Sequence, residues 1–209
     1  MLEPITRPSV RRWEILSGGV ETVERVADVR YRVLVILSDT HGDVGHDLTD
    51  HLLRAVRNAD RVVHAGDFTT ESVLESVLDA APRLDAVHGN ADDNAVRERL
   101  PSERVLEYEG SRIAVTHWKP GGQTGLSMFG RSVGADLVVY GHTHNPGVVM
   151  KGDPILVNPG SHTTPRGHRP GYAELSAGDG GLAGTLRALD GTVRNRFSVA
   201  GTTPPSNPE

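Results

Sequence analysis

Five short runs of mainly apolar, β-branched residues, each followed closely by aspartate, asparagine or histidine, constrain this chain more than any other feature. The runs span residues 33–37, 61–65, 84–88, 112–116 and 136–140. They alternate with segments whose apolar residues recur at helical spacing, at 48–58, 71–80, 94–100 and 126–133. Strands that alternate with helices in this way predict parallel βαβ units.

The second half of the chain has a different character, because strand-like runs now follow one another with only turns between them. These runs span 147–150, 154–157, 171–175, 185–189 and 193–199. Such a pattern predicts antiparallel strands, and the whole chain then reads as an α+β fold or a layered sandwich in which two sheets pack face to face. We expect an N-terminal extension of uncertain order over 1–30, one domain over 31–199, and a disordered tail over 200–209.

Composition excludes several classes of protein. The chain has 209 residues, a formal net charge of -5 and no cysteine. The missing cysteines exclude disulfides, thiolate metal ligands and a cysteine nucleophile. The negative net charge does not indicate a surface that binds nucleic acid or an anionic membrane. No apolar run has the length or position of a membrane span or a secretory signal. We therefore expect a cytoplasmic protein with a small substrate, and a homo-oligomer is compatible with the sequence.

The polar residues after the five runs are candidate metal ligands. They are Asp39, His41, Asp67, Asn90, His117, His142 and His144. Because the carboxyl ends of parallel strands share one edge of a sheet, we expect these side chains to converge there. Three neighbouring glycines would let the backbone turn sharply beside them: Gly42, Gly66 and Gly89. A single aspartate after a strand is more often a turn or cap residue, but five strand ends that obey one rule favour a metal site.

Other polar residues near these segments keep two interpretations. His64 and His88 precede ligand segments, where each either orients a ligand through a hydrogen bond or is a satisfied core histidine. Asp92 either orients a ligand such as His117 or caps the helix that follows it. Two histidines around the first helical segment are assigned to the surface, His46 and His51.

Five segments of the chain together resemble the calcineurin-like metallophosphoesterase superfamily. They are SDTHG (38–42), AGD (65–67), GN (89–90), TH (116–117) and GHTH (141–144), in that family's order. The likeness spans about residues 31–166. NPGSHTTPR (158–166) is similar to a segment of the small bacterial and archaeal phosphodiesterase branch, which is related to a retromer scaffold subunit.

The resemblance implies a four-layer α/β/β/α sandwich, in which two mixed sheets flanked by helices hold two metal ions. The first ion would be bound by Asp39, His41, Asp67 and His144. The second would be bound by Asp67, Asn90, His117 and His142. Asp67 would bridge the two ions, and Asp67, Asn90 and His117 would be catalytic.

The donor types suit Mn²⁺ as the favoured ion, with Fe, Zn²⁺, Co²⁺ or Ni²⁺ compatible, and contain too much nitrogen for Ca²⁺. Two such ions lower the pKa of a bridging water, so that a hydroxide attacks the phosphorus without any protein nucleophile. The resemblance thus implies a phosphodiesterase acting on a small phosphodiester. The alternative is a non-catalytic or weakly catalytic scaffold of the same fold that binds a protein partner.

One position, Ala91, departs from the patterns of the family and bears on the substrate. Phosphomonoesterases of the superfamily carry a histidine directly after the ligand asparagine, and the phosphodiesterase branch commonly carries a cysteine, whereas this chain has Ala91. Alanine donates no proton, which favours diesters with acidic leaving groups, with His162 the nearest substitute donor. The loop formed by Asn158, Gly160, Ser161 and Arg166 resembles the family's closing loop, and its arginine is either a substrate contact or a surface residue of a turn.

Overall fold

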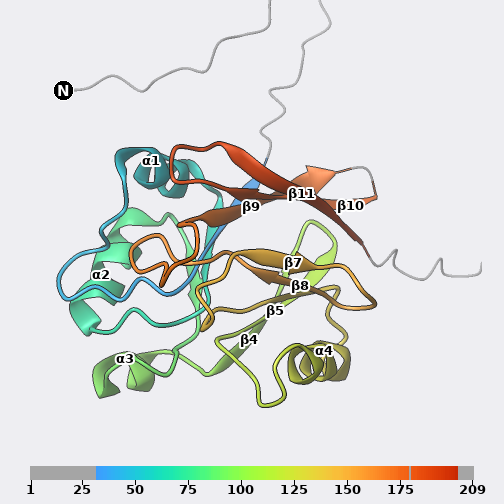
Figure 1. Cartoon of the computed structure of the whole chain (residues 1–209), viewed down its shortest axis with the longest axis horizontal. Coiled ribbons are helices and arrows are strands. Elements are labelled where there is room, and N and C mark those ends of the chain that lie inside the picture. The colour runs from blue at the N-terminus through green and yellow to red at the C-terminus, as the bar shows by residue number, and fades with distance from the viewer. Residues whose placement is uncertain (1–31, 179, 202–209) are drawn as a thin grey trace, which may run out of the picture. The chain divides into compact units, whose positions relative to one another are not determined.

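The computed structural model of the chain describes residues 32–178 and 180–201. The extension expected over 1–30 lies outside these residues, as does the expected tail apart from Ala200 and Gly201. In the described part, two β-sheets face each other, and helices cover their outer sides (Figure 1). The four-layer α+β sandwich expected from the family resemblance is therefore confirmed.

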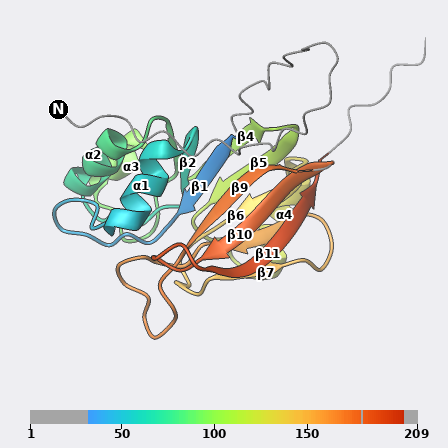
Figure 2. The ribbon, with the colours of Figure 1, turned by 90° about the horizontal axis from the view of Figure 1, so that it is seen from above.

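The first sheet has six strands in the order β11-β10-β9-β1-β2-β3. Its parallel half contains β1 (Val33–Leu37), β2 (Arg61–His64) and β3 (Leu84–Ala86). Its antiparallel half contains β9 (Tyr172–Gly178), β10 (Gly181–Arg187) and β11 (Val193–Ala200). β9 joins the halves by pairing antiparallel with β1, so a late strand lies beside the first one (Figure 2).

The second sheet has five strands in the order β4-β5-β6-β8-β7. They are β4 (Glu103–Tyr108), β5 (Ser111–Thr116), β6 (Leu137–Val139), β8 (Ile155–Asn158) and β7 (Gly147–Val149). β5, β6 and β8 run parallel to one another. The strands after residue 147 were all expected to be antiparallel. β8 pairs antiparallel with β7 but parallel with β6, because the segment that contains β7 returns the chain to the start of β6.

The four helices of the described residues begin where the local sequence offers a cap or a glycine turn. They are α1 (Asp50–Asn58), α2 (Glu71–Ala80), α3 (Asn94–Arg99) and α4 (Gln123–Ser132). The side chains of Thr49, Thr70 and Asp93 accept backbone N–H groups in the first turns of α1, α2 and α3. α4 follows Gly122 and starts three residues before the apolar pattern predicted.

The core lies in three layers of buried apolar residues. Between the sheets, Ile36 and Val63 of the first sheet belong to the same cluster as Val115 of the second, and all are fully buried. Leu52 of α1 packs on the outer face of the first sheet, and Leu126 of α4 packs on the second. Each such side chain contributes roughly 1.5–3 kcal/mol on burial, so the strands that carry the polar residues are held rigidly.

The distribution of the strands corrects one expectation. The polar residues were expected at a single sheet edge, but β1, β2 and β3 belong to the first sheet, whereas β5 and β6 belong to the second. The donors therefore converge from two facing sheets. Among the described helices, none is long and apolar enough to cross a membrane.

Candidate metal centre

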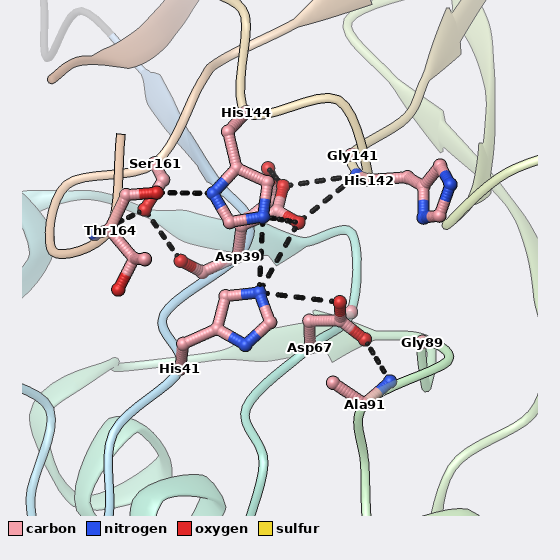
Figure 3. A network of polar contacts seen from close by, with 12 residues as sticks. Asp39, His41, Asp67, Gly89, Ala91, Gly141, His142, His144, Ser161 and Thr164 are labelled. Carbon is pink, nitrogen blue, oxygen red and sulfur yellow. Dashed lines mark hydrogen bonds and ion pairs between the residues drawn. The ribbon is translucent and has the colours of Figure 1, made fainter. Parts of the chain in front are cut away.

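All seven candidate ligands lie after strand ends of the two sheets. Figure 3 labels five of them: Asp39, His41, Asp67 and His144 point toward one another, whereas the ring of His142 is turned away from these four and contacts Asn90. Two trios of carboxylate and imidazole donors have their ligand atoms within 4.8 Å of one another: Asp39 with His41 and His144, and Asp39 with Asp67 and His117. The donors form a gradient of burial, because Asp39, Asp67, His117 and His144 are at most 2 % exposed, whereas Asn90 and His142 are exposed.

The first group of donors surrounds a space that suits one cation. Nε2 of His41 lies 3.4 Å from Oδ2 of Asp67, 3.9 Å from Oδ1 of Asp39 and 3.1 Å from Nε2 of His144. Nε2 of His144 lies 3.3 Å from Oδ1 of Asp39. Donors that share an ion at bond lengths of about 2.0–2.2 Å lie roughly 3–3.5 Å apart, so three of these four separations fit and the fourth is slightly long.

The second group continues from the same carboxylate. Nε2 of His117 lies 3.1 Å from Oδ2 of Asp67 and 3.1 Å from Oδ1 of Asn90. Nδ1 of His142 lies 2.6 Å from the same oxygen of Asn90. Oδ2 of Asp67 thus faces both groups, while its Oδ1 accepts the backbone N–H of Ala91 at 2.7 Å. A single carboxylate oxygen between two donor groups is suited to bridge two cations.

Backbone carbonyls fix the ring nitrogens of two histidines. Nδ1 of His117 donates to the carbonyl oxygen of Ala65 at 2.7 Å, and Nδ1 of His144 donates to that of Thr164. Each ring therefore directs the lone pair of Nε2 into the site, which is the arrangement of metal-binding histidines. Because these inward atoms are acceptors that face other acceptors, a cation is the ligand that satisfies them together.

Electrostatics favour the metal-binding charge states of Asp67 and His41, whereas the raised pKa of His117 favours a proton that a metal ion would have to displace. Burial alone would raise the pKa of Asp67, but the hydrogen bond and the charge of His117, together with the Ala91 N–H group, lower it to about 2. Burial lowers the pKa of His41. The hydrogen bond and charge of Asp67 outweigh burial and raise the pKa of His117. At neutral pH the Asp67 carboxylate is therefore anionic and the imidazole of His41 is neutral.

The backbone is strained at five of the seven candidate ligands. The φ angles of Asp39, His41, Asp67, His142 and His144 are 54°, 44°, 63°, 69° and 57°. Residues other than glycine adopt this left-handed region at a cost of about 1–3 kcal/mol, and such strain concentrates at functional sites. The turn expected after Gly141 explains how two histidines only two positions apart both face the site.

Gly141 leaves no room for a side chain at that turn. A Cβ atom there would lie 2.7 Å from Oδ2 of Asp39 and 3.0 Å from Nδ1 of His117. The next backbone N–H, that of His142, donates to both carboxylate oxygens of Asp39 at 3.1 Å. Gly141 thus lets the segment after β6 approach Asp39, the candidate ligand that follows β1.

Asp92 orients a candidate ligand, as the first of its two interpretations expected, but the ligand is Asp67 and the contact is with its backbone. Its Oδ2 accepts the backbone N–H groups of Asp67 at 3.1 Å and of Gly89 at 2.7 Å, and its Oδ1 accepts that of Thr69 at 2.7 Å. The cap of α3 is Asp93 instead, and the carbonyl of Ala65 orients His117. Asp92 therefore positions the backbone of two ligand loops.

His64 satisfies both of its interpretations at once. It is fully buried, its Nδ1 accepts the N–H of Gly66 at 3.2 Å, and its Nε2 donates to Oγ1 of Thr40 at 2.8 Å. Thr40 lies between two ligands, so this core histidine also holds their loop. His88 faces the carbonyl of Gly89 at 3.3 Å. His46 and His51, expected at the surface, are half-buried.

The loop over 158–166 lies directly against the candidate ligands. Nδ2 of Asn158 donates to the carbonyl of Gly141 at 2.8 Å, and Oγ of Ser161 donates to that of Asp39 at 2.7 Å. Gly160 accepts Oγ of Ser38 at 3.0 Å through its carbonyl. Arg166 is exposed, and its positive charge adds, after burial, to the lowering of the pKa of His41 and of His142.

His162 is poorly placed to donate a proton to a leaving group. Its side chain is buried, its Nε2 donates to the carbonyl of His46 at 3.0 Å, and burial lowers its pKa to about 4. The ring is thus neutral at pH 7, and its one bonded N–H is already used. The expectation that it substitutes for the missing donor is wrong for this conformation.

Trp118 is a site residue that the sequence patterns did not single out. Its ring stacks on His142 with centroids 5.7 Å apart and planes at 26°, and the residue is 47 % exposed. Its only signal in the sequence is its position directly after His117.

Comparisons with known proteins agree with this geometry. The family model for the calcineurin-like phosphoesterase superfamily domain matches residues 33–180. A probable metallophosphoesterase of Methanothermobacter thermautotrophicus is 36 % identical over 135 residues, which are 63 % of this chain and 77 % of the relative. The phosphodiesterase YfcE of Escherichia coli K12 is 29 % identical over 158 residues, 66 % of this chain and 83 % of YfcE. The crystal structure of Vps29 with Zn²⁺ from Entamoeba histolytica has a TM-score of 0.65 at 20 % identity, and covers 79 % of this chain and 98 % of Vps29.

Proposed function

Because this chain belongs to the calcineurin-like phosphoesterase superfamily, we propose that it is a dinuclear metal-dependent phosphodiesterase. One observation carries the proposal: Oδ2 of Asp67 lies 3.1 Å from Nε2 of His117 and 3.4 Å from Nε2 of His41. A carboxylate oxygen between two groups of inward-facing donors is the arrangement that two neighbouring cations require.

The two ions have distinct sets of ligands in this proposal. Asp39, His41, Asp67 and His144 hold the first, and Asp67, Asn90, His117 and His142 hold the second. Mn²⁺ is the favoured ion, and Fe, Zn²⁺, Co²⁺ and Ni²⁺ suit the same donors. When bound, the ions supply an activated water and neutralise the charge on the phosphoryl oxygens.

The buried and the exposed side chains of the site have different roles in this proposal. The buried donors hold the ions in place, while exposed Asn90 and His142 form the side from which a substrate enters. In this proposal the exposed Arg166, which ends the loop that packs on the candidate ligands, contributes a positive charge to the phosphoryl group. A guanidinium fork suits two oxygens of one phosphate, and this favours a substrate contact over a surface role.

A diester is the better substrate for two reasons. Ala91 leaves the position after Asn90 without a proton donor, which slows alkyl phosphomonoesters more than diesters with acidic leaving groups. YfcE, whose aligned segment covers 66 % of this chain, is named a phosphodiesterase.

The test combines metal content with turnover. The purified protein, stripped with a chelator and reloaded with Mn²⁺, should bind two ions per chain and hydrolyse bis(4-nitrophenyl) phosphate only after reloading. The exposed carboxylate of Asp79 on α2 offers a matched control, since Asp79→Asn should change neither result. A chain that binds metal without turnover would favour the scaffold, and a chain with neither would refute the proposal.

A further inference from the structure

A cavity of about 440 Å³ opens beside the candidate metal centre. It is bordered by the turn before α4, the end of β6 and β7. His142, a candidate ligand of the second ion, lies on its wall, so the cavity and the metal centre share a side chain. A group attached to a phosphate at the metals can therefore extend directly into this cavity.

The lining of the cavity is mainly apolar and aromatic. Leu126 and Tyr140, at 3 % and 9 % exposure, form its buried part, and Val149 packs against the same cluster. Trp118 lies at its rim, 47 % exposed, with its ring stacked on His142. An apolar pocket with a large aromatic ring at its entrance is typical of small-molecule sites.

The charge at the rim is already balanced. Lys119, the cation that lines the cavity, pairs with Glu103 and lies 4.5 Å from the centroid of the Phe129 ring. Its charge is therefore engaged, and the pocket offers little to a second anion. The phosphate belongs at the metals, and an uncharged group belongs in the cavity.

Two glycines before α4, Gly121 and Gly122, border the cavity. A Cβ atom at Gly122 would meet no atom within 4 Å, and Gly121 is nearly as free.

We propose that this cavity binds a planar aromatic ester group of the phosphodiester, stacked against Trp118 with the phosphorus beside His142. The inference rests on the proposed function and adds its substrate class. Stacking on an aromatic side chain is worth roughly 5- to 150-fold in affinity. A simple aryl ester and a nucleobase present the same flat face.

A second cavity offers room for the other ester group of a diester. It has a volume of about 200 Å³ and also borders Trp118, but its lining includes the charged Arg97 and Glu103 together with Asn90. One ester group can enter the apolar cavity while the other lies against this polar one. The two groups of a diester are thereby distinguished.

The first experiment measures binding without turnover. Diphenylphosphinate and dimethylphosphinate are both monoanions with no ester bond to cleave, and they differ in their rings. Calorimetry on the metal-loaded protein should show at least 5-fold tighter binding of diphenylphosphinate. In a Trp13→Phe background Trp118 is the sole tryptophan, and its fluorescence should respond to the diphenyl compound alone.

Three variants separate a stacking role from a role in positioning His142. Trp118→Ala should abolish the preference for diphenylphosphinate, Trp118→Phe should restore part of it, and Met128→Ala should leave it unchanged. Met128 is an exposed apolar residue of α4 that does not border the cavity. A merely positioning role predicts equal weakening of both phosphinates by Trp118→Ala.

The outcomes distinguish this inference from the proposed function. Hydrolysis of bis(4-nitrophenyl) phosphate without any preference between the phosphinates, or with a preference that survives Trp118→Ala, overturns the pocket and leaves the phosphodiesterase intact. No hydrolysis of any diester overturns the proposed function. A preference lost only in Trp118→Ala supports the pocket whatever the rate of turnover. A nucleoside 5′-(4-nitrophenyl) phosphate compared with the bis-aryl ester then separates a nucleobase from a simple aryl group.

Discussion

The carboxylate of Asp92 accepts the backbone N–H of Asp67 at 3.1 Å and thereby holds the proposed bridging ligand from behind. The same carboxylate accepts the N–H groups of Gly89 and Thr69, and the side chain is only 5 % exposed. It therefore ties the loop after β2 to the loop after β3. The left-handed conformation of Asp67 persists because neighbouring groups of this kind determine its position.

Replacing Asp92 by asparagine should damage both stability and metal binding. An amide puts an NH₂ group opposite a backbone donor, and the loss of a hydrogen bond to a charged group costs about 1.5–3 kcal/mol. Metal affinity should fall roughly 10- to 100-fold, as it does when supporting groups of metal ligands are lost. Thermal unfolding and metal titration are the measurements. Asp93→Asn is the matched control, since asparagine caps a helix as well as aspartate; equal effects of the two variants would contradict the assignment.

The candidate ligands could be named from the sequence because each follows a strand, and five strand ends repeat the pattern. The supporting role of Asp92 stayed one of two alternatives, because an aspartate near a turn carries no sequence signature that separates a ligand-orienting carboxylate from a helix cap. Trp118 went unnoticed for a similar reason, since a lone tryptophan is more often a core residue. Its stacking on His142 depends on the pairing of β5 with β6, which brings the segments after these two strands together.

Asp67→Asn should remove a negative charge that both proposed ions share. An amide oxygen is a weaker ligand, so metal content should fall from two ions per chain, and turnover should fall by roughly 10²–10³-fold or more. The fold should remain, because the amide can still accept the N–H of Ala91. Elemental analysis and circular dichroism test both statements. Two tightly held ions and near-normal activity in this variant would show that Asp67 is not the bridge.

Removing a ligand that binds only one of the two proposed ions should empty only that ion's position. His144→Ala should deplete the ion proposed near Asp39 and His41, and Asn90→Ala should deplete the ion proposed near His117. Anomalous scattering from crystals grown with Mn²⁺ would locate the remaining ion. If either variant emptied both positions equally, the division into two groups of donors would be wrong.

Most strands were predictable, but β4 was not. Its residues alternate between the exposed Glu103 and Glu107 and the buried Leu106 and Tyr108, on an edge of the second sheet. Edge strands carry charges that resemble those of a surface loop. The partition of the parallel strands into two sheets was also beyond the local pattern, because pairing partners are set by packing between layers.

The unfolding free energy should depend on pH through His162. Burial lowers its pKa from the ordinary 6.5 to about 4. Above pH 6.5 the ring is neutral in both states; between pH 6.5 and 4 the unfolded chain binds a proton that the folded protein does not. Stability therefore falls with falling pH by up to about 1.4 kcal/mol per unit, or about 3 kcal/mol by pH 4.

Denaturant titrations at several pH values check this dependence. His162→Gln should make the slope between pH 6.5 and 4 shallower by up to one proton, and the remaining slope should come from other buried groups such as His64. The exposed His168 provides the control, because His168→Gln should leave the slope unchanged. An unaltered slope in His162→Gln would mean that this ring titrates normally in the folded protein.

Ala91 should determine which leaving groups the enzyme can expel. Its backbone N–H already binds Oδ1 of Asp67 at 2.7 Å, so a new side chain at this position adds chemistry without removing that contact. The wild type should show a steep dependence of kcat/KM on leaving-group pKa and hydrolyse aryl diesters faster than alkyl monoesters. Ala91→His should flatten the dependence, with gains of up to roughly 10²–10⁴-fold for the poorest leaving groups. Ala91→Phe controls for bulk without a proton. A wild type that hydrolyses alkyl monoesters faster than aryl diesters would refute the argument, because no donor is then needed at this position.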